Sequence, residues 1–203
     1  MAAYAFRLFV TMLASLPVYV LFRYLVLSRR AKRLGVKAGT AKVKLTFNKL
    51  RELCLGLFVV FMMALLVFVW QGTIHSPAVM LRIVKQRILY GEGINLVPFR
   101  TIRNYYRTFG VRGNLFGVNI LGNVLMFVPW GFGLLLLWKK NRHFGRLLCF
   151  AALLPIFIEF TQLFIERQVD VDDFILNFLG GTLGGLLFFL LAKIFPKLKT
   201  AAL

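Results

Sequence analysis

The stretch FIEFTQLFIERQVDVDDFILNFLGG, residues 157–181, decides the fold because it joins two long apolar segments through a short acidic connection. The chain carries only seven acidic residues against 26 basic ones, and five of the seven lie in this stretch. They are Glu159, Glu166, Asp170, Asp172 and Asp173. Carboxylates inside segments this apolar normally face the interior of a helical bundle or a water-filled cavity. The stretch therefore predicts two helices that meet at a polar junction.

The composition of the whole chain is typical of a membrane protein. Its 203 residues are 60% hydrophobic, more than a soluble domain of this size can cover. The apolar residues form blocks close to the roughly 20 residues that cross a bilayer, at residues 4–27, 53–70, 116–138, 147–165 and 174–195. We predict an all-α, multi-pass membrane protein of about five transmembrane helices. The predicted parts are an anchor with a basic cytoplasmic loop (1–52), a four-helix membrane domain (53–196) and a cytoplasmic tail (197–203).

The basic residues predict an orientation in the membrane. A net charge of +19 suits nucleic-acid binding or membrane topology signals, and the apolar blocks favour the latter. With five spans, the basic connections at residues 28–51, 139–146 and 193–199 share one side, which the positive-inside rule assigns to the cytoplasm. The N-terminus is then outside and the C-terminus inside. Residues 71–115 place seven basic residues outside, but the rule weakens for longer loops.

This outer loop has helical patterns of its own. SPAVMLRIVKQRILY opens with Ser76 at an N-cap position and Pro77 at the first helical position, which predicts an amphipathic helix at the membrane surface. Its polar face would carry Arg82, Lys85 and Gln86, and its apolar face Met80, Val84 and Ile88. Farther on, Arg100, Arg103 and Arg107 form a basic stripe if their segment is helical. Two interpretations stay open, an anchor for lipid phosphates and a specific anion site.

Polar residues at helical spacing mark the last three predicted spans. They are Asn119 with Asn123, Glu159 with Gln162, and Asp173 with Asn177. Each pair points from one helix face, and the predicted topology places all three pairs at the outer leaflet. Glu159 lies roughly 9 Å along the helix from the end of its predicted span. It could be protonated, paired with an arginine of the outer loop or bound to a cationic ligand, or it could only fix packing by bonding the asparagines.

The carboxylates of Asp170, Asp172 and Asp173 suit two roles. Oxygen ligands at alternate positions suit calcium or magnesium, but neither a glycine turn nor a glutamate at EF-hand spacing accompanies them. We favour helix capping, with Asp172 or Asp173 at the start of the fifth helix and Arg167 neutralising one carboxylate. No metal and no cofactor are therefore predicted. The sequence also holds no Walker loop, nucleophile elbow or HExxH motif.

Glycines and prolines predict how the last three spans pack. The fifth span has two overlapping pairs of small residues that let neighbouring helices approach closely, Gly180 with Gly184 and Gly181 with Gly185. Pro129, followed by Gly131, loosens the third span, and Pro155 loosens the fourth. We interpret these residues as packing features.

The chain also holds a series of motifs: INLVPFRTI, then NILGNVLMFVPWGF, then IEFTQLF and RQVDVDDFILNFLGGTLGG. In this order they resemble the VanZ-like family of small bacterial membrane proteins, over about residues 95–185. The matching positions are Asn95, Pro98, Phe99, Asn123, Phe127, Pro129, Gly131, Glu159, Gln162, Arg167, Asp170, Asp173, Asn177 and Gly180. The resemblance implies a relative of a protein that lowers susceptibility to teicoplanin-type, lipid-tailed glycopeptides. It implies no reaction at these positions.

These observations lead to three hypotheses. We favour a non-enzymatic protein at the outer face of the cytoplasmic membrane that binds an envelope ligand, with the stripe of Arg100 and Arg103 holding phosphate or carboxylate. Such a ligand is an anionic lipid, a lipid-linked cell-wall precursor or a lipoglycopeptide antibiotic, and not a nucleic acid. One alternative is an intramembrane enzyme for a lipid-linked phosphate substrate, with Glu159 as acid or base and Asp173 as its partner. The other is a small lipid transporter gated by Glu159.

Overall fold

The computed structural model describes residues 10, 13–25, 28, 49–69, 76–112 and 115–201. The chain divides into two compact units, Met1–Val67 and Phe68–Leu203, which we describe separately. The described residues are almost wholly helical, which confirms the all-α class.

Helices long and apolar enough to cross a membrane confirm the second to fifth predicted spans. They are Leu50–Val69, Asn119–Leu137, Phe144–Gln162 and Val171–Ile194. The predicted first span is described only in part, as a shorter apolar helix at Leu13–Leu25. Its flanks at residues 4–9, 11–12 and 26–27 lie outside the described residues, as does most of the basic connection after it.

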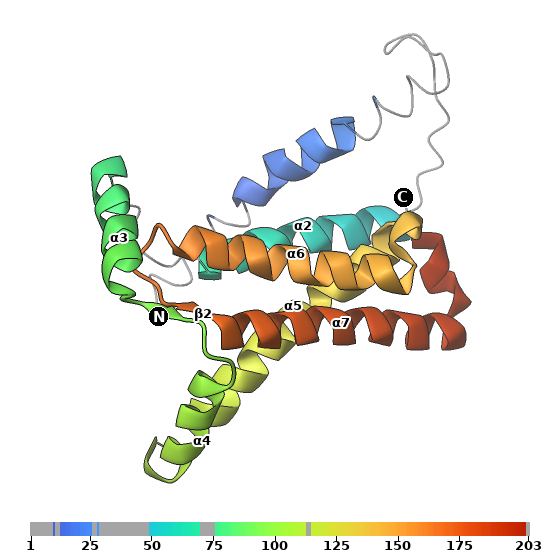
Figure 1. Ribbon diagram of the computed structural model, residues 1–203. Coiled ribbons are helices and arrows are strands. Elements are labelled where there is room, and N and C mark those ends of the chain that lie inside the picture. Colours follow the sequence, from blue (N-terminus) through green and yellow to red (C-terminus); the bar gives the residue numbers. More distant parts are fainter. Residues whose placement is uncertain are drawn as a thin grey trace. The chain divides into compact units, whose positions relative to one another are not determined.

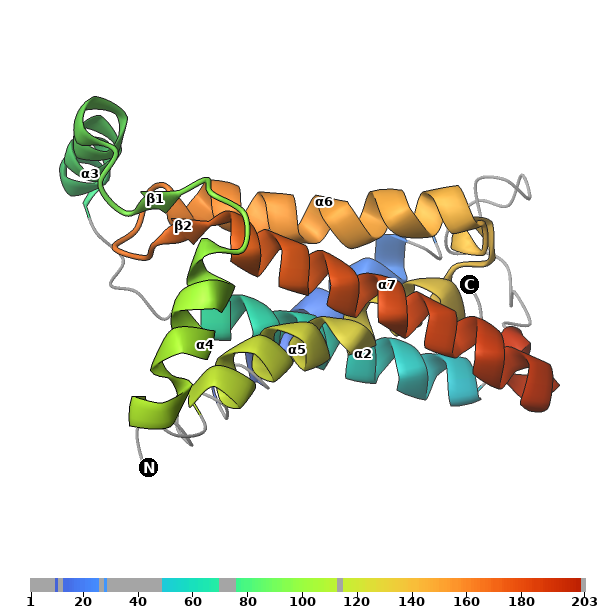
Figure 2. The same cartoon turned by 60° about the horizontal axis from the view of Figure 1, so that its bottom comes forward.

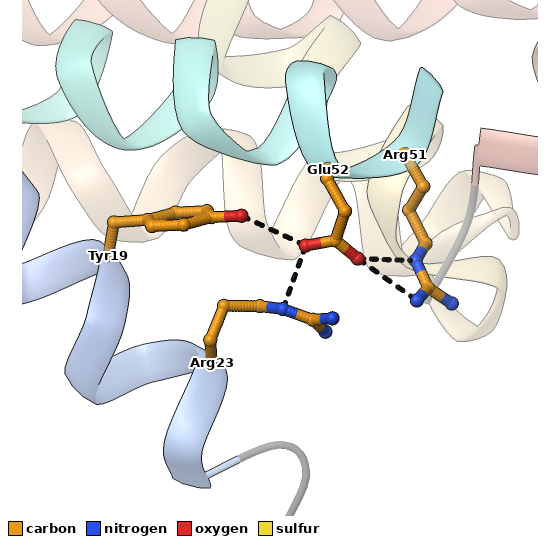
Figure 3. A network of polar contacts seen from close by, with 4 residues as sticks. All are labelled: Tyr19, Arg23, Arg51 and Glu52. Atoms are coloured by element: carbon orange, nitrogen blue, oxygen red, sulfur yellow. Dashed lines mark hydrogen bonds and ion pairs between the residues drawn. The ribbon is translucent and has the colours of Figure 1, made fainter. Parts of the chain in front are cut away.

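The first unit holds the helix Leu13–Leu25 and most of α2 (Lys49–Val69). A carboxylate joins them, because Glu52 in the first turn of α2 accepts from Arg23 Nε at 2.7 Å and from the Tyr19 hydroxyl at 2.9 Å (Figure 3). Arg51 donates to the other oxygen of Glu52 from Nη2 at 3.1 Å. This network was not predicted from the sequence, although Arg23 inside an apolar block is a charge that needs a partner.

The second unit is built on α5 (Leu115–Leu137), α6 (Phe144–Gln162) and α7 (Val171–Ile194). The last of these, α7, packs against both of the others and most extensively against α5 (Figure 1). Two short 3₁₀ helices, η1 (Lys139–Asn141) and η2 (Pro196–Ala201), lie at one end of the bundle. Arg142 fixes that end by donating to the Lys199 carbonyl at 3.2 Å, so two of the basic segments lie together.

The glycines of α7 explain the close packing of this bundle. A Cβ atom on Gly180 or Gly184 would overlap a backbone carbonyl of α5, at Val124 and Val128 respectively. On another face, Gly181 lies against Ala151 of α6. The predicted close approach of helices is therefore confirmed, with α5 on one side of α7 and α6 on the other.

Gly131 and the prolines take part in the same packing. A Cβ atom on Gly131 would overlap the Gly181 carbonyl, so this position admits only glycine. Pro129 lies inside α5 and Pro155 inside α6, and both helices continue through them.

Three elements precede α5 in the second unit (Figure 2). Helix α3 (Pro77–Tyr90) begins after Ser76 and ends at Gly91 in the left-handed conformation, so the predicted helix is confirmed. The strand β1 (Ile94–Asn95) pairs in parallel with β2 (Val169–Asp170), a bridge that the sequence did not predict. Helix α4 (Arg100–Arg112) follows β1, so the segment with the basic stripe is helical.

Candidate functional site

The β1–β2 bridge brings the start of α4, the end of α6 and the start of α7 to one place. We call this place the polar junction and define it by the residues listed here: Asn95, Thr101, Asn123, Glu159, Gln162, Asp170, Asp172 and Asp173. It contains members of all three predicted polar pairs, namely Asn123 of α5, Glu159 and Gln162 of α6, and Asp173 of α7. Each of its carboxylates has different partners.

Asp170 is the N-cap of α7, and its carboxylate accepts from the Asp172 amide at 2.9 Å. The prediction that Asp172 or Asp173 caps this helix was wrong. Helix α7 begins at Val171, three residues before the predicted residue 174, because the bridge with β1 holds Asp170 in the extended conformation that an N-cap adopts.

The same Asp170 carboxylate also binds the segment around β1. Its Oδ1 accepts from the Asn95 amide at 2.9 Å, and its Oδ2 accepts from the Thr101 hydroxyl. Asn95 Nδ2 further donates to Thr101 Oγ1 at 3.1 Å. Both oxygens of Asp170 are thus engaged inside the chain.

Asp172 caps a different helix, α4, from about 70 residues away in the sequence. Its oxygens accept from the backbone amides of Phe99, Thr101 and Ile102, the latter two at 2.8 and 3.1 Å. The Asp172 side chain is 0% exposed. Phe99 adopts φ +64°, a left-handed conformation that a non-glycine residue rarely takes. The sequence signal was the start of α4 at Pro98-Phe99-Arg100, which offers no capping residue of its own.

Asp173 faces α5, where the Asn123 amide donates to its Oδ1 at 2.8 Å. Asn119 lies one turn earlier in α5 and is half-buried. Asn177, one turn after Asp173, is 6% exposed, and its Oδ1 has no hydrogen-bond partner among the described residues. The three aspartates therefore serve three separate contacts, and the described residues contain no group of three or more His, Cys, Asp or Glu side chains that could hold a metal.

Glu159 binds the backbone of the junction. Its Oε2 accepts from the Asp170 amide at 3.0 Å. The Gln162 amide, turned so that its nitrogen faces acceptors, donates to the same oxygen at 3.2 Å and to the Gln168 carbonyl at 3.1 Å. The other oxygen, Oε1, is buried and has no partner within the described part of the chain. The described contacts of Glu159 do not include Asn119 or Asn123, so the alternative in which it only fixes packing by bonding those asparagines is not observed.

Glu159 also lies nearer the end of its helix than predicted. Helix α6 ends at Gln162, since residues 163–166 form turns, and Glu159 is therefore about 4.5 Å along the axis from the end.

Beside Glu159, a groove of about 390 Å³ opens between α6, β2 and the start of α7. It is lined by Leu96, Ile156, Glu159, Phe160, Leu163, Val169, Asp170, Val171 and Phe174. Among these, Leu96, Ile156 and Phe160 are exposed, so the groove is open along one side. It combines an apolar surface with Glu159, whose buried Oε1 has no hydrogen-bond partner among the described residues.

Arg87 of α3 is a structural residue that the sequence interpretation missed. It is 7% exposed and donates to the carbonyls of Ile165 at 2.9 Å and Arg167 at 2.5 Å, with a longer contact to Gly93. Burial lowers the pKa of its guanidinium from the usual value. The signal was its position seven residues after Met80, which places a charge on the predicted apolar face.

The other arginines in the described residues form no ion pair with the junction carboxylates. Arg167 is exposed, and no ion pair joins it to Glu159 or Asp173 in the described part of the chain. The predicted ion pair between Arg167 and one of the aspartates is therefore not observed among the described residues. Arg100, Arg103 and Arg107 are exposed on one face of α4, as the stripe requires.

The membrane-length helices, together with the polar junction at one end of the bundle of α5, α6 and α7, define a multi-pass membrane protein with a buried polar site. The family model VanZ/LLP1 matches residues 55–192, more than half of the sequence. The chain therefore belongs to the VanZ/LLP1 family, as its motifs predicted. Searches found no significantly similar curated protein and no significantly similar solved structure.

Proposed function

We propose that this protein binds an envelope ligand at the polar junction without catalysing a reaction, and that binding lowers susceptibility to teicoplanin-type lipoglycopeptides. The observation that supports ligand binding most is Glu159, whose Oε1 is buried without a partner beside an open apolar groove. A buried acceptor left unpaired is unfavourable, so it favours a ligand that supplies a donor. The exposed arginines of α4 supply the opposite charge for a phosphate or carboxylate elsewhere on the ligand.

The proposed location is the outer face of the cytoplasmic membrane, with the N-terminus outside and the C-terminus inside. The two basic segments joined by Arg142 and Lys199 lie at the opposite end of the bundle from the junction, as this orientation requires. In a variant without Cys54 and Cys149, Gln168→Cys should react with an impermeant thiol reagent on intact cells and Lys140→Cys should not. The reverse pattern would contradict the orientation.

An enzymatic role has weaker support. The predicted acid–base partners, Glu159 and Asp173, bond different elements, the Asp170 amide and the Asn123 side chain. A substrate would have to displace those bonds before the two carboxylates acted together.

The test is antibiotic susceptibility in a sensitive Gram-positive host, with teicoplanin compared with vancomycin. The wild type should protect selectively against teicoplanin, and Glu159→Gln and Arg103→Ala should both lose that protection. Glu166→Gln and Arg82→Ala are matched controls, because both residues are exposed and lie outside the junction and the α4 stripe. Equal susceptibility of all strains, with equal amounts of protein in the membrane, would reject the proposed phenotype.

A further inference from the structure

We infer that the groove beside Glu159 binds the part of a membrane amphiphile where an apolar chain meets a hydrogen-bond donor, namely a hydroxyl, amide or ammonium group. The inference rests on the proposed function and specifies its ligand. The occupant is a lipid-like molecule that enters sideways from the membrane.

The surface of the groove argues for an apolar chain. Seven of its nine lining residues are apolar, and only Glu159 and Asp170 are not. Two of the apolar ones, Ile156 and Phe160, are exposed on a helix of membrane-spanning length, so the groove opens where lipid would surround α6. Its volume of about 390 Å³ is near the lower end of ligand pockets. The groove therefore suits a segment of an amphiphile rather than a whole lipid.

The hydrogen bonds of the two carboxylates decide where the polar group would bind. Both Asp170 oxygens already accept, from Asn95, Thr101 and the Asp172 amide. Glu159 Oε2 accepts from the Asp170 amide. Only Glu159 Oε1 lacks a partner among the described lining residues. We therefore assign Oε1 as the acceptor of the ligand's donor.

The lining offers an anionic group no positively charged partner. Two carboxyl groups border the groove, and neither has an arginine or lysine within ion-pair distance among the described residues. A phosphate in the groove would therefore have no cation to pair with, whereas a donor would gain an acceptor. A phosphate on the same ligand would have to lie outside the groove.

Photolabelling of the full chain in lipid nanodiscs tests the inference. The probe is a long-chain alcohol with a diazirine next to the hydroxyl, and the matched probe is its methyl ether, which has no donor. The alcohol should label peptides within residues 156–174, in competition with unlabelled alcohol. It should exceed the ether by about tenfold at limiting concentration, the range expected for one hydrogen bond to a carboxyl oxygen.

Matched variants locate the label. Ile156→Trp should block it, because Ile156 lines the groove, while Leu153→Trp one turn earlier should not. The two side chains are similarly exposed on α6, at 52% and 55%. Glu159→Gln should abolish the preference for the alcohol. The Asp170 amide would hold the glutamine oxygen, which leaves an NH₂ group where Oε1 was.

Equal labelling of the two tryptophan variants, or equal labelling by alcohol and ether, would overturn the inference. Either result would mean that the probe contacts the lipid-facing surface without a specific site. Photolabelling measures whether the groove is occupied, and this measurement does not depend on the antibiotic phenotype. Specific labelling with unchanged teicoplanin susceptibility would therefore reject the proposed phenotype alone.

Discussion

Glu52 and Glu159 are both carboxylates at the ends of apolar helices, yet their surroundings differ. Glu52 contacts two guanidinium groups and a phenol, all from the chain itself (Figure 3). Glu159 contacts only neutral donors, the Asp170 amide and Gln162, and one of its oxygens has no partner among the described residues. The charge of Glu52 is compensated by arginines of the same chain, whereas Oε1 of Glu159 remains without a donor among the described residues.

This difference separates a stabilising carboxylate from one available to a ligand. The side chains of Arg23 and Glu52 are 10% and 13% exposed, so removal of Glu52 takes the carboxylate away from a largely buried guanidinium. A neutral amide can replace Glu159 and keep its bond to the backbone, because no cation depends on it. Stability should therefore depend strongly on the first residue and weakly on the second.

The largest effect is expected from Glu52→Ala. It removes the carboxylate that pairs with the largely buried guanidinium groups of Arg23 and Arg51, a loss of about 3–5 kcal/mol in the free energy of unfolding. For a chain of this length that corresponds to a melting temperature lower by roughly 10 °C. Thermal unfolding of the purified protein in one detergent measures it.

The control is a double-mutant cycle with Arg23→Ala. The double variant should be less destabilised than the sum of the single ones, because both single variants remove the same Arg23–Glu52 contact and the sum counts it twice. Additive losses would show that the ion pair contributes little, and the contrast with Glu159 would then fail.

A smaller effect is expected from Asp172→Ala, within the polar junction itself. The backbone amides of Phe99, Thr101 and Ile102 would lose their acceptor, at a cost of about 2–4 kcal/mol. Hydrogen exchange should accelerate at the start of α4 before the rest of the bundle is affected. Asp172→Asn, which keeps one acceptor oxygen, should lose less. Unchanged exchange in α4 would show that the cap does not hold this helix.

The sequence predicted features that depend on local spacing. The four long apolar helices, the start of α3 and the glycine contacts of α7 follow from patterns within about 20 residues. The first span is described only as the short helix Leu13–Leu25.

The sequence did not predict contacts between distant segments. The β1–β2 bridge joins Asn95 to Asp170, and the cap of α4 comes from Asp172. Because the partners are more than 70 residues apart, no spacing rule connects them. Asp170, Asp172 and Asp173 looked equivalent in the sequence, but in the structure each binds a different segment of the chain.

The smallest effect on stability is expected from Glu159→Gln, and this variant tests the contrast most directly. The amide oxygen can still accept from the Asp170 backbone, so the free energy of unfolding should change by less than about 1 kcal/mol. The melting temperature should then fall by less than about 4 °C, in the same detergent as the Glu52 series. A loss as large as that of Glu52→Ala would mean that the carboxylate holds the junction together, and its unpaired oxygen would no longer argue for a ligand. A small loss together with loss of teicoplanin protection would assign Glu159 to ligand binding, because the fold would be intact where the function is not.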